Sequence, residues 1–194
     1  MSTAVGVALL TVTLAAAGGA GWDAALPRPV IEAGLNKAKC TVPASEARVL
    51  GSEFLSSRLR IVEVACWQSD ANAGSILFAV PVGRPQDAQL VSVDRWEDGK
   101  VQGGFSISSP GFDAKTRTLS STHKVSDAGD CGTIQEMKWT GWHFRLLHVW
   151  SKDRCDGELF EWDGRYRWQV FPQRGLEPDP EGSATPDETT YAAR

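Results

Sequence analysis

Apolar and polar positions alternate through the middle of the chain, between short segments rich in glycine, proline and polar residues. Such runs of β-branched and apolar residues are typical of β-strands. Pro81 is expected at a strand end or a sheet edge, because it cannot donate to the ladder. The predicted strands are 59–67, 75–82, 89–96, 101–107 and 119–125.

The pattern is helical only near the N-terminal end. Val30, Ile31, Leu35 and Ala38 share one helix face and follow two prolines, which favours a short helix ending near Cys40. A second short helix is expected over residues 43–50. Helices therefore make a small contribution to the predicted fold.

Two similar segments follow in the C-terminal part. One runs from Cys131 to Gly141 and the other from Cys155 to Gly164. Each has a cysteine, a strand ending in tryptophan, and a Thr-Gly or Asp-Gly turn before an aromatic-rich strand. Residues 96–99 form a looser third copy. Glycine supplies the positive φ of tight hairpin turns, so these segments predict antiparallel hairpins.

The pattern predicts a mainly β fold of about seven to nine strands, with one or two short N-terminal helices. The strands are expected to form an antiparallel meander sheet, or a sandwich or barrel. One domain is expected over 26–172. The tail 175–194 is rich in Pro, Glu, Asp and Thr, which favours disorder.

The N-terminal segment 1–20 is typical of a signal peptide. Its uncharged apolar stretch, 4–17, is shorter than the roughly 20 residues of a membrane-spanning helix. Small residues at 15–17 offer a cleavage site. The alternative is a buried N-terminal helix. We expect export to the periplasm or medium, with no membrane span left after cleavage.

The four cysteines are expected to form two disulfides, because an even number in an exported chain favours a disulfide framework. Cys131 and Cys155 occupy equivalent positions of the two hairpin units, so we predict that they pair. Cys40 would then pair with Cys66. Four reduced, buried cysteines are the alternative for a chain that stays in a reducing compartment.

The net charge of −4 and the pI near 5.4 argue against binding to nucleic acid or anionic lipid, both of which select basic surfaces. No cofactor-binding motif is present, so no cofactor is expected. We expect the partner to be an envelope protein or a cell-wall component.

Metal and catalytic sites are not predicted. His143 and His148 are five positions apart, which on a regular strand places them on opposite faces. Acidic residues near 127–130 and 153–158 are expected in solvated turns, without calcium-loop spacing. No serine has a nucleophile motif, although a triad assembled from distant residues stays open.

The eight tryptophans allow two interpretations. Aromatic platforms bind sugars, but tryptophans beside hairpin turns also stabilise sheets through cross-strand pairs. The sequence favours the structural role for four of them: Trp139, Trp142, Trp162 and Trp168.

The motifs resemble the exported bacterial domain-of-unknown-function family 1176, in its C-terminal half. The residues that carry the resemblance are 129–132, 137–141, 144–146 and Cys155, with 64–67 and 71–73 upstream. The resemblance extends over 26–171 and implies export and paired cysteines. It implies no substrate and no catalytic residues.

We therefore expect a non-catalytic envelope module that binds a protein or a cell-wall ligand. A sharper version is an inhibitor or immunity-like protein against a cell-wall hydrolase, since an acidic domain suits a basic enzyme. The alternatives are an envelope glycan hydrolase with an unrecognised carboxylate site and a purely structural envelope component.

Overall fold

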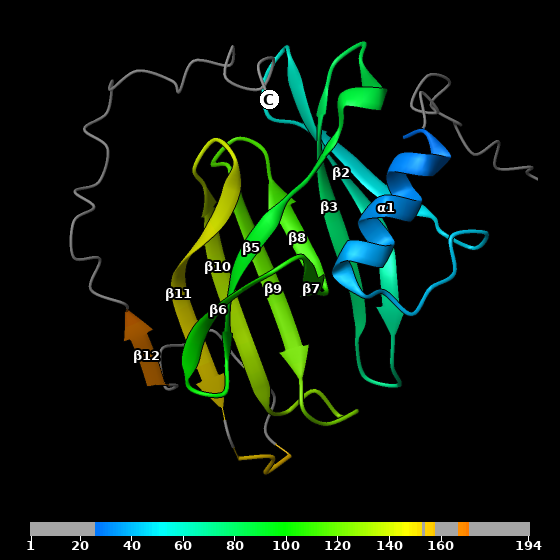
Figure 1. Cartoon of the computed structure of the whole chain (residues 1–194). Coiled ribbons are helices and arrows are strands. Elements are labelled where there is room, and N and C mark those ends of the chain that lie inside the picture. Colours follow the sequence, from blue (N-terminus) through cyan, green and yellow to red (C-terminus); the bar gives the residue numbers. More distant parts are fainter. Residues whose placement is uncertain (1–25, 153, 158–166, 171–194) are drawn as a thin grey trace, which may run out of the picture.

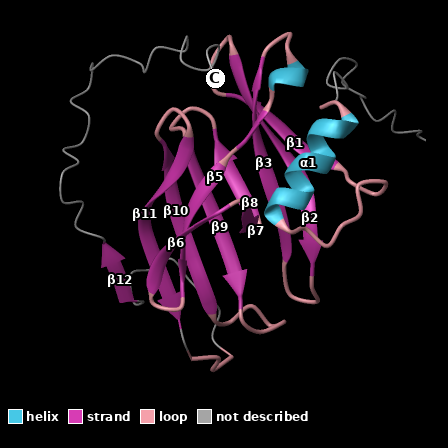
Figure 2. Cartoon of the chain, in the orientation of Figure 1, coloured by secondary structure: helices cyan, strands magenta, loops and turns pink. Residues whose placement is uncertain are grey.

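The computed structural model describes residues 26–152, 154–157 and 167–170, and over these residues the expected mainly β fold is confirmed (Figures 1 and 2). The elements are α1 (Arg28–Ala38), β1 (Val49–Phe54), β2 (Leu59–Gln68), β3 (Ala73–Pro81), the 3-10 helix η1 (Pro85–Asp87), β4 (Gln89–Leu90), β5 (Ser92–Glu97), β6 (Lys100–Gly104), β7 (Ser106–Ser108), β8 (Pro110–Asp113), β9 (Thr118–Lys124), β10 (Gly132–Trp139), β11 (His143–Lys152) and β12 (Arg167–Val170).

The strands form two sheets. The first has the order β1-β2-β3-β4, with β7 also on β3, and the second has the order β6-β5-β11-β10-β9-β8, with β12 on β11. Most pairs are antiparallel, as the sequence predicts for a meander or a sandwich, but β5 runs parallel to β11. A hairpin forces antiparallel pairing only between consecutive strands. β5 and β11 are far apart in the chain, so either direction was open to them.

Three layers result, with a hydrophobic core on each side of the first sheet. One core lies between the sheets and includes Ile61 and Leu77 from the first sheet and Met137 and Phe144 from the second. The other core, which includes Phe78, lies between the first sheet and α1 (Figure 1). Because both faces of the first sheet are covered, β2 and β3 are apolar almost throughout rather than alternating.

α1 is held by a close backbone approach and by a covalent link. A Cβ added at Gly34 would lie 2.4 Å from the Phe78 ring, so glycine lets the helix reach the sheet. Lys39 ends the helix in the left-handed conformation at φ 58°. Cys40, the next residue, is paired with Cys66 on β2. The sequence predicted both this helix and this pairing.

The second helix expected over residues 43–50 is wrong. Residues 44–46 form a turn, and β1 begins at Val49 and pairs antiparallel with β2. The neighbouring strand determines the secondary structure of this segment. β2 has an open edge, and hydrogen bonds to that edge outweigh a weak local preference for helix.

Two buried side-chain amides join segments far apart in the chain. The Asn72 amide donates to the Lys124 carbonyl and its oxygen accepts from the Lys124 N–H, each at 2.8 Å. The Gln135 oxygen accepts from the Trp96 N–H at 2.6 Å, and its amide donates to the Trp96 carbonyl at 3.3 Å. Each amide thus acts as one peptide unit of an extra strand, the first linking the two sheets and the second linking β10 to β5.

The signal-like segment 1–20, the tail 175–194 and most of the second hairpin unit lie outside the described residues. In the part of the chain that is described, no helix has the length and apolar character needed to cross a membrane.

Candidate functional site

The turn between β10 and β11 places two tryptophans in opposite environments. Trp139 is buried and packs on Phe144 with ring centroids 5.1 Å apart, whereas Trp142 is 66% exposed. Gly141 between them has φ 105°, a conformation that side chains disfavour. The predicted structural role therefore fits Trp139, but Trp142 lies outside the core. The exposed indole therefore presents an aromatic face to solvent.

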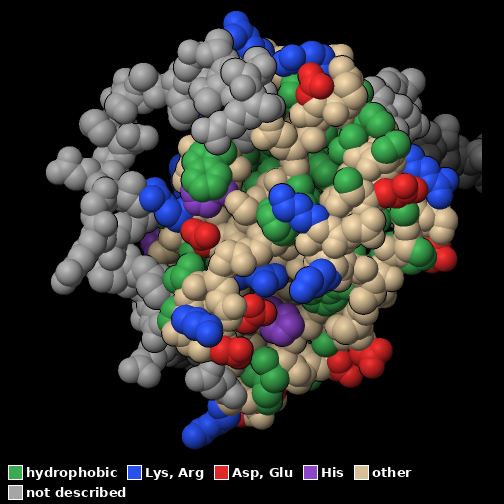
Figure 3. Space-filling view, in the orientation of Figure 1, with side chains coloured by type: hydrophobic (Ala, Val, Ile, Leu, Met, Phe, Trp, Pro, Cys, Tyr) green, Lys and Arg blue, Asp and Glu red, His purple; other side chains and the backbone are tan. Residues whose placement is uncertain are grey.

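Trp142 is supported from below by His143. Their ring centroids are 3.8 Å apart, with an angle of 38° between the planes. The His143 side chain is 14% exposed, and it lies on the opposite face of β11 from the buried Phe144. At this place in the space-filling view, a hydrophobic side chain covers a histidine, with basic and acidic side chains next to it (Figure 3). The exposed indole thus rests on a largely buried ring.

The contacts of Thr140 indicate which tautomer His143 adopts. The Thr140 hydroxyl lies 2.6 Å from His143 Nδ1 and 3.0 Å from the His143 carbonyl oxygen. We assign the single hydroxyl proton to the carbonyl, which also accepts from the Thr140 N–H, and this assignment makes Nδ1–H the donor to Thr140. In the neutral imidazole, Nε2 is therefore unprotonated and is a hydrogen-bond acceptor.

Nε2 of His143 faces a second acceptor. Asp94 on β5 places Oδ2 3.9 Å from Nε2, and the parallel pairing of Ser92 with His143 brings the two strands together. Burial lowers the pKa of His143 below its ordinary value of 6.5; the Asp94 carboxylate partly opposes this, and Arg145 adds to it. The imidazole is therefore neutral at pH 7, and two acceptors face one site.

Arg145 adds positive charge to the same corner. It lies directly across from Lys138 in the β10–β11 register, and like charges in such a pair repel. Lys138 donates to the Thr116 carbonyl at 2.6 Å, whereas the Arg145 Nε is buried without a hydrogen-bond acceptor among the described residues. We define the platform as Asp94, Trp142, His143 and Arg145.

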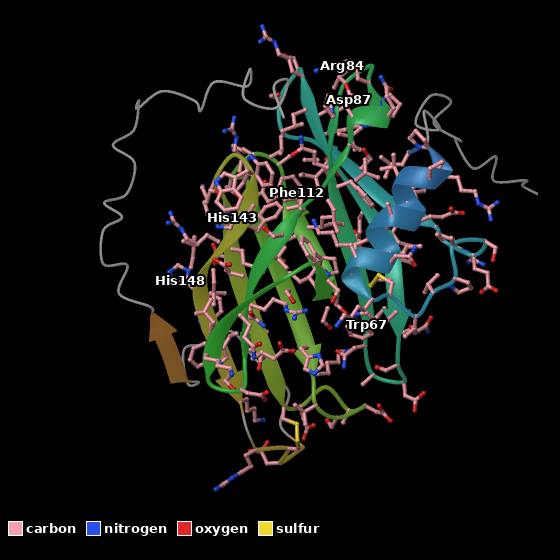
Figure 4. The ribbon with its side chains drawn as sticks, in the orientation of Figure 1. Trp67, Arg84, Asp87, Phe112, His143 and His148 are labelled. Atoms are coloured by element: carbon pink, nitrogen blue, oxygen red, sulfur yellow. A yellow bond between two sulfur atoms is a disulfide. The ribbon has the colours of Figure 1, made fainter. Side chains whose placement is uncertain are left out.

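His148 belongs to a separate group. The register of β10 and β11 shifts by one residue at Leu147, so that His148 faces Glu136 and His143 points to the same side of the sheet as His148. The prediction that the two histidines lie on opposite faces is wrong, because a bulge reverses the alternation. The His148 Nδ1 lies 3.5 Å from Glu136, and His148 is farther along the strand in Figure 4. Each imidazole has its own carboxylate neighbour.

The acidic residues near the second disulfide make turn contacts. Asp130 accepts from the Ser126 hydroxyl and from the Gly157 N–H, and these hydrogen bonds hold its pKa below 3.8. Asp156 pairs with Lys152 at 2.6 Å, while Asp153 and Glu158 lie outside the described residues. The Asp130 carboxylate also approaches the sulfurs of Cys131 and Cys155, but these are paired with each other and offer no thiolate.

Three serines that occur in serine pairs of the sequence make structural hydrogen bonds. Ser56 accepts from the N–H groups of Arg58 and Leu59, while Ser120 and Ser121 donate to backbone carbonyls on the neighbouring strand segment. No described histidine is bonded to any of them. These hydroxyls therefore hold turns and strands together.

The sequence did not single out Asp94, Thr140 or Arg145. Asp94 reaches His143 only because β5 lies parallel to β11, and local periodicity does not encode that pairing. The sequence pattern assigns Thr140 only to the Thr-Gly turn. The available signal was the local run of Thr-Gly-Trp-His, which places a polar side chain three positions before a histidine within a tight turn.

Comparison with known proteins agrees with the resemblance seen in the sequence. No curated protein and no solved structure matches the chain. Residues 12–170 match a protein family described as protein of unknown function (DUF1176), which covers the whole platform, both cysteine pairs and the two sheets. This chain therefore belongs to the DUF1176 family.

Proposed function

We propose that this protein is a non-catalytic binding module of the bacterial envelope, and that the platform is its contact surface. The observation that carries the proposal is the indole of Trp142, which is 66% exposed yet held in place on His143. Hot spots of binding surfaces favour a rigid aromatic side chain with charged groups beside it. A fixed ring loses little conformational entropy on binding.

Export is the second part of the proposal. Both cysteine pairs lie at disulfide distance, as expected in an oxidising compartment. The signal-like segment 1–20 is consistent with the same location. The ligand would then be a cell-wall component or an envelope protein, and an inhibitor of a basic cell-wall hydrolase is the sharpest protein version of the proposal.

A glycan hydrolase is the second candidate, because Thr140, His143 and Asp94 follow one another as hydroxyl, imidazole and carboxylate. The hydrogen bonds argue against this function. The Thr140 proton is donated to a carbonyl, and Nδ1 is itself a donor, so this imidazole cannot accept the hydroxyl proton. The 3.9 Å between Nε2 and Asp94 Oδ2 is also too long for an orienting hydrogen bond.

The test compares the disulfide-bonded protein with its Trp142→Ala variant. Retention on insoluble cell wall and inhibition of lysozyme at micromolar concentration are measured for both. Binding or inhibition that the variant loses supports the proposal. Neither activity, or an activity that Trp142→Ala leaves unchanged, would overturn it. Release of soluble sugar from the cell wall would instead support the hydrolase.

A further inference from the structure

The platform combines groups that suit a saccharide, and this inference rests on the proposed function of the same surface. We propose that Trp142 stacks on the apolar face of a pyranose ring in a cell-wall glycan, while His143 Nε2 and Asp94 Oδ2 accept hydrogen bonds from its hydroxyl or amide groups.

The first step concerns the indole. The faces of a pyranose ring carry C–H groups, which pack against the electron-rich face of an aromatic ring, while its hydroxyls lie around the rim. A flat, exposed ring with polar groups beside it is complementary to that pattern. Trp142 is the only described tryptophan among the exposed large hydrophobic residues. Its contact with His143 restricts the orientation of the indole ring.

The second step concerns the two acceptors. Nε2 of neutral His143 and Oδ2 of Asp94 lie 3.9 Å apart, and no described residue donates a hydrogen bond to either atom. One donor between them can serve both acceptors. Sugar hydroxyls and acetamido N–H groups are such donors, whereas an apolar or acceptor-rich ligand would leave both acceptors unpaired at a cost.

The charges on the platform limit the class of glycan that can bind. Asp94 sets a negative group beside His143, and the positive charge of Arg145 is near enough to His143 to lower its pKa. A neutral or zwitterionic glycan satisfies both signs. A strongly anionic polymer would meet Asp94, and it would also meet a protein whose net charge is −4.

The experiment is a calorimetric or NMR titration with a soluble tetramer of N-acetylglucosamine and, separately, with glycan strands released from purified cell wall. A non-cell-wall oligosaccharide, maltotetraose, is the third arm. We expect saturable binding of the first two ligands, weakened about tenfold or more by Trp142→Ala and by Asp94→Ala, and weakened less by Trp142→Phe, which keeps a ring. If maltotetraose binds equally well, the platform binds saccharides, but its assignment to cell-wall glycan is wrong.

The matched control is Val125→Ala. Val125 is 68% exposed, like Trp142, but lies where β9 ends, at the other end of β10 from the β10–β11 turn. This variant should bind like the parent protein, and melting curves should show that all variants fold. No saturation by any saccharide at millimolar concentration, or binding that Trp142→Ala does not change, would overturn the inference. If the protein binds no saccharide but inhibits a hydrolase, and Trp142→Ala abolishes that inhibition, the saccharide assignment is wrong and the proposed binding function stands.

Discussion

Gly132 occupies a position that admits no side chain. It has φ 147°, and an added Cβ would lie 2.1 Å from the backbone oxygen of His123 on the paired strand. Glycine follows Cys131 here because β9 and β10 meet at a close backbone approach. A side chain would have to push the two strands apart, and a backbone contact cannot be relieved by rotating a side chain.

Gly132→Ala is therefore expected to reduce the free energy of unfolding by about 2 kcal/mol or more, from strain and overpacking together. Gly103→Ala is the control, because Gly103 is an exposed strand glycine with nothing within 4 Å of the added Cβ. Urea unfolding of both variants measures the difference. Equal midpoints would show that the strands relax without cost.

Binding at the platform should depend on pH through His143. Burial lowers the pKa of His143 below 6.5, so the imidazole is neutral at pH 7. Protonation would place a donor on Nε2 and pair it with Asp94, which removes both acceptors from the ligand. The groups facing His143 are Asp94 from β5 and Arg145 from β11.

We expect glycan affinity to be constant from about pH 8 to 7 and to fall as the pH drops below 6.5 through the pKa of His143. The same titration repeated at several pH values measures this. His143→Gln, which cannot be protonated, should flatten the profile. Affinity that rises on acidification would contradict the assigned tautomer.

At the scale of secondary-structure elements, the side-chain amide of Asn72 links the two sheets. It lies in the loop between β2 and β3 and pairs with both backbone groups of Lys124 at the end of β9. Asn72→Ala should therefore lower the free energy of unfolding by about 1–3 kcal/mol, through two lost hydrogen bonds. The exposed Gln86 on η1 supplies a control, Gln86→Ala, with little expected effect. If the two variants unfold at the same denaturant concentration, the link contributes nothing.

The second cysteine pair joins the start of β10 to the segment after β11. We predict that Cys131→Ser lowers the free energy of unfolding of the oxidised protein by about 2–4 kcal/mol, since the unfolded chain gains freedom. The double change Cys131→Ser, Cys155→Ser should cost little more. Thermal melting compares them, and non-reducing peptide mapping identifies the pairs. A peptide joining Cys66 to Cys131 would contradict the pairing.

Local patterns predicted the elements whose partners are adjacent in the chain. The helix before Cys40 has prolines at its start, and the Asp98-Gly99 turn has positive φ at both residues, as a tight hairpin requires. β1 and the bulge at Leu147 were missed because each depends on a neighbouring strand rather than on local sequence. The platform was missed for the same reason: Asp94 and His143 are nearly 50 positions apart in the chain and meet through one parallel pairing.

At the scale of the whole molecule, the layers leave the β10–β11 turn at one end of the second sheet, away from α1 (Figure 1). The helix and both sheets bury their apolar faces in two cores, and Trp142 belongs to neither core. Loops supported by a rigid scaffold commonly carry function. This separation means that binding and folding can be changed independently at the platform.

The central claim, that the platform is the binding surface, is tested most directly by the indole N–H signals of the ¹⁵N-labelled protein during titration with cell-wall glycan strands. The Trp142 signal is assigned from its loss in Trp142→Phe, and the Trp139 signal from its loss in Trp139→Phe. We predict a saturable shift of the Trp142 signal, with little change at the buried Trp139. A ligand that binds while the Trp142 signal stays in place would contradict the account.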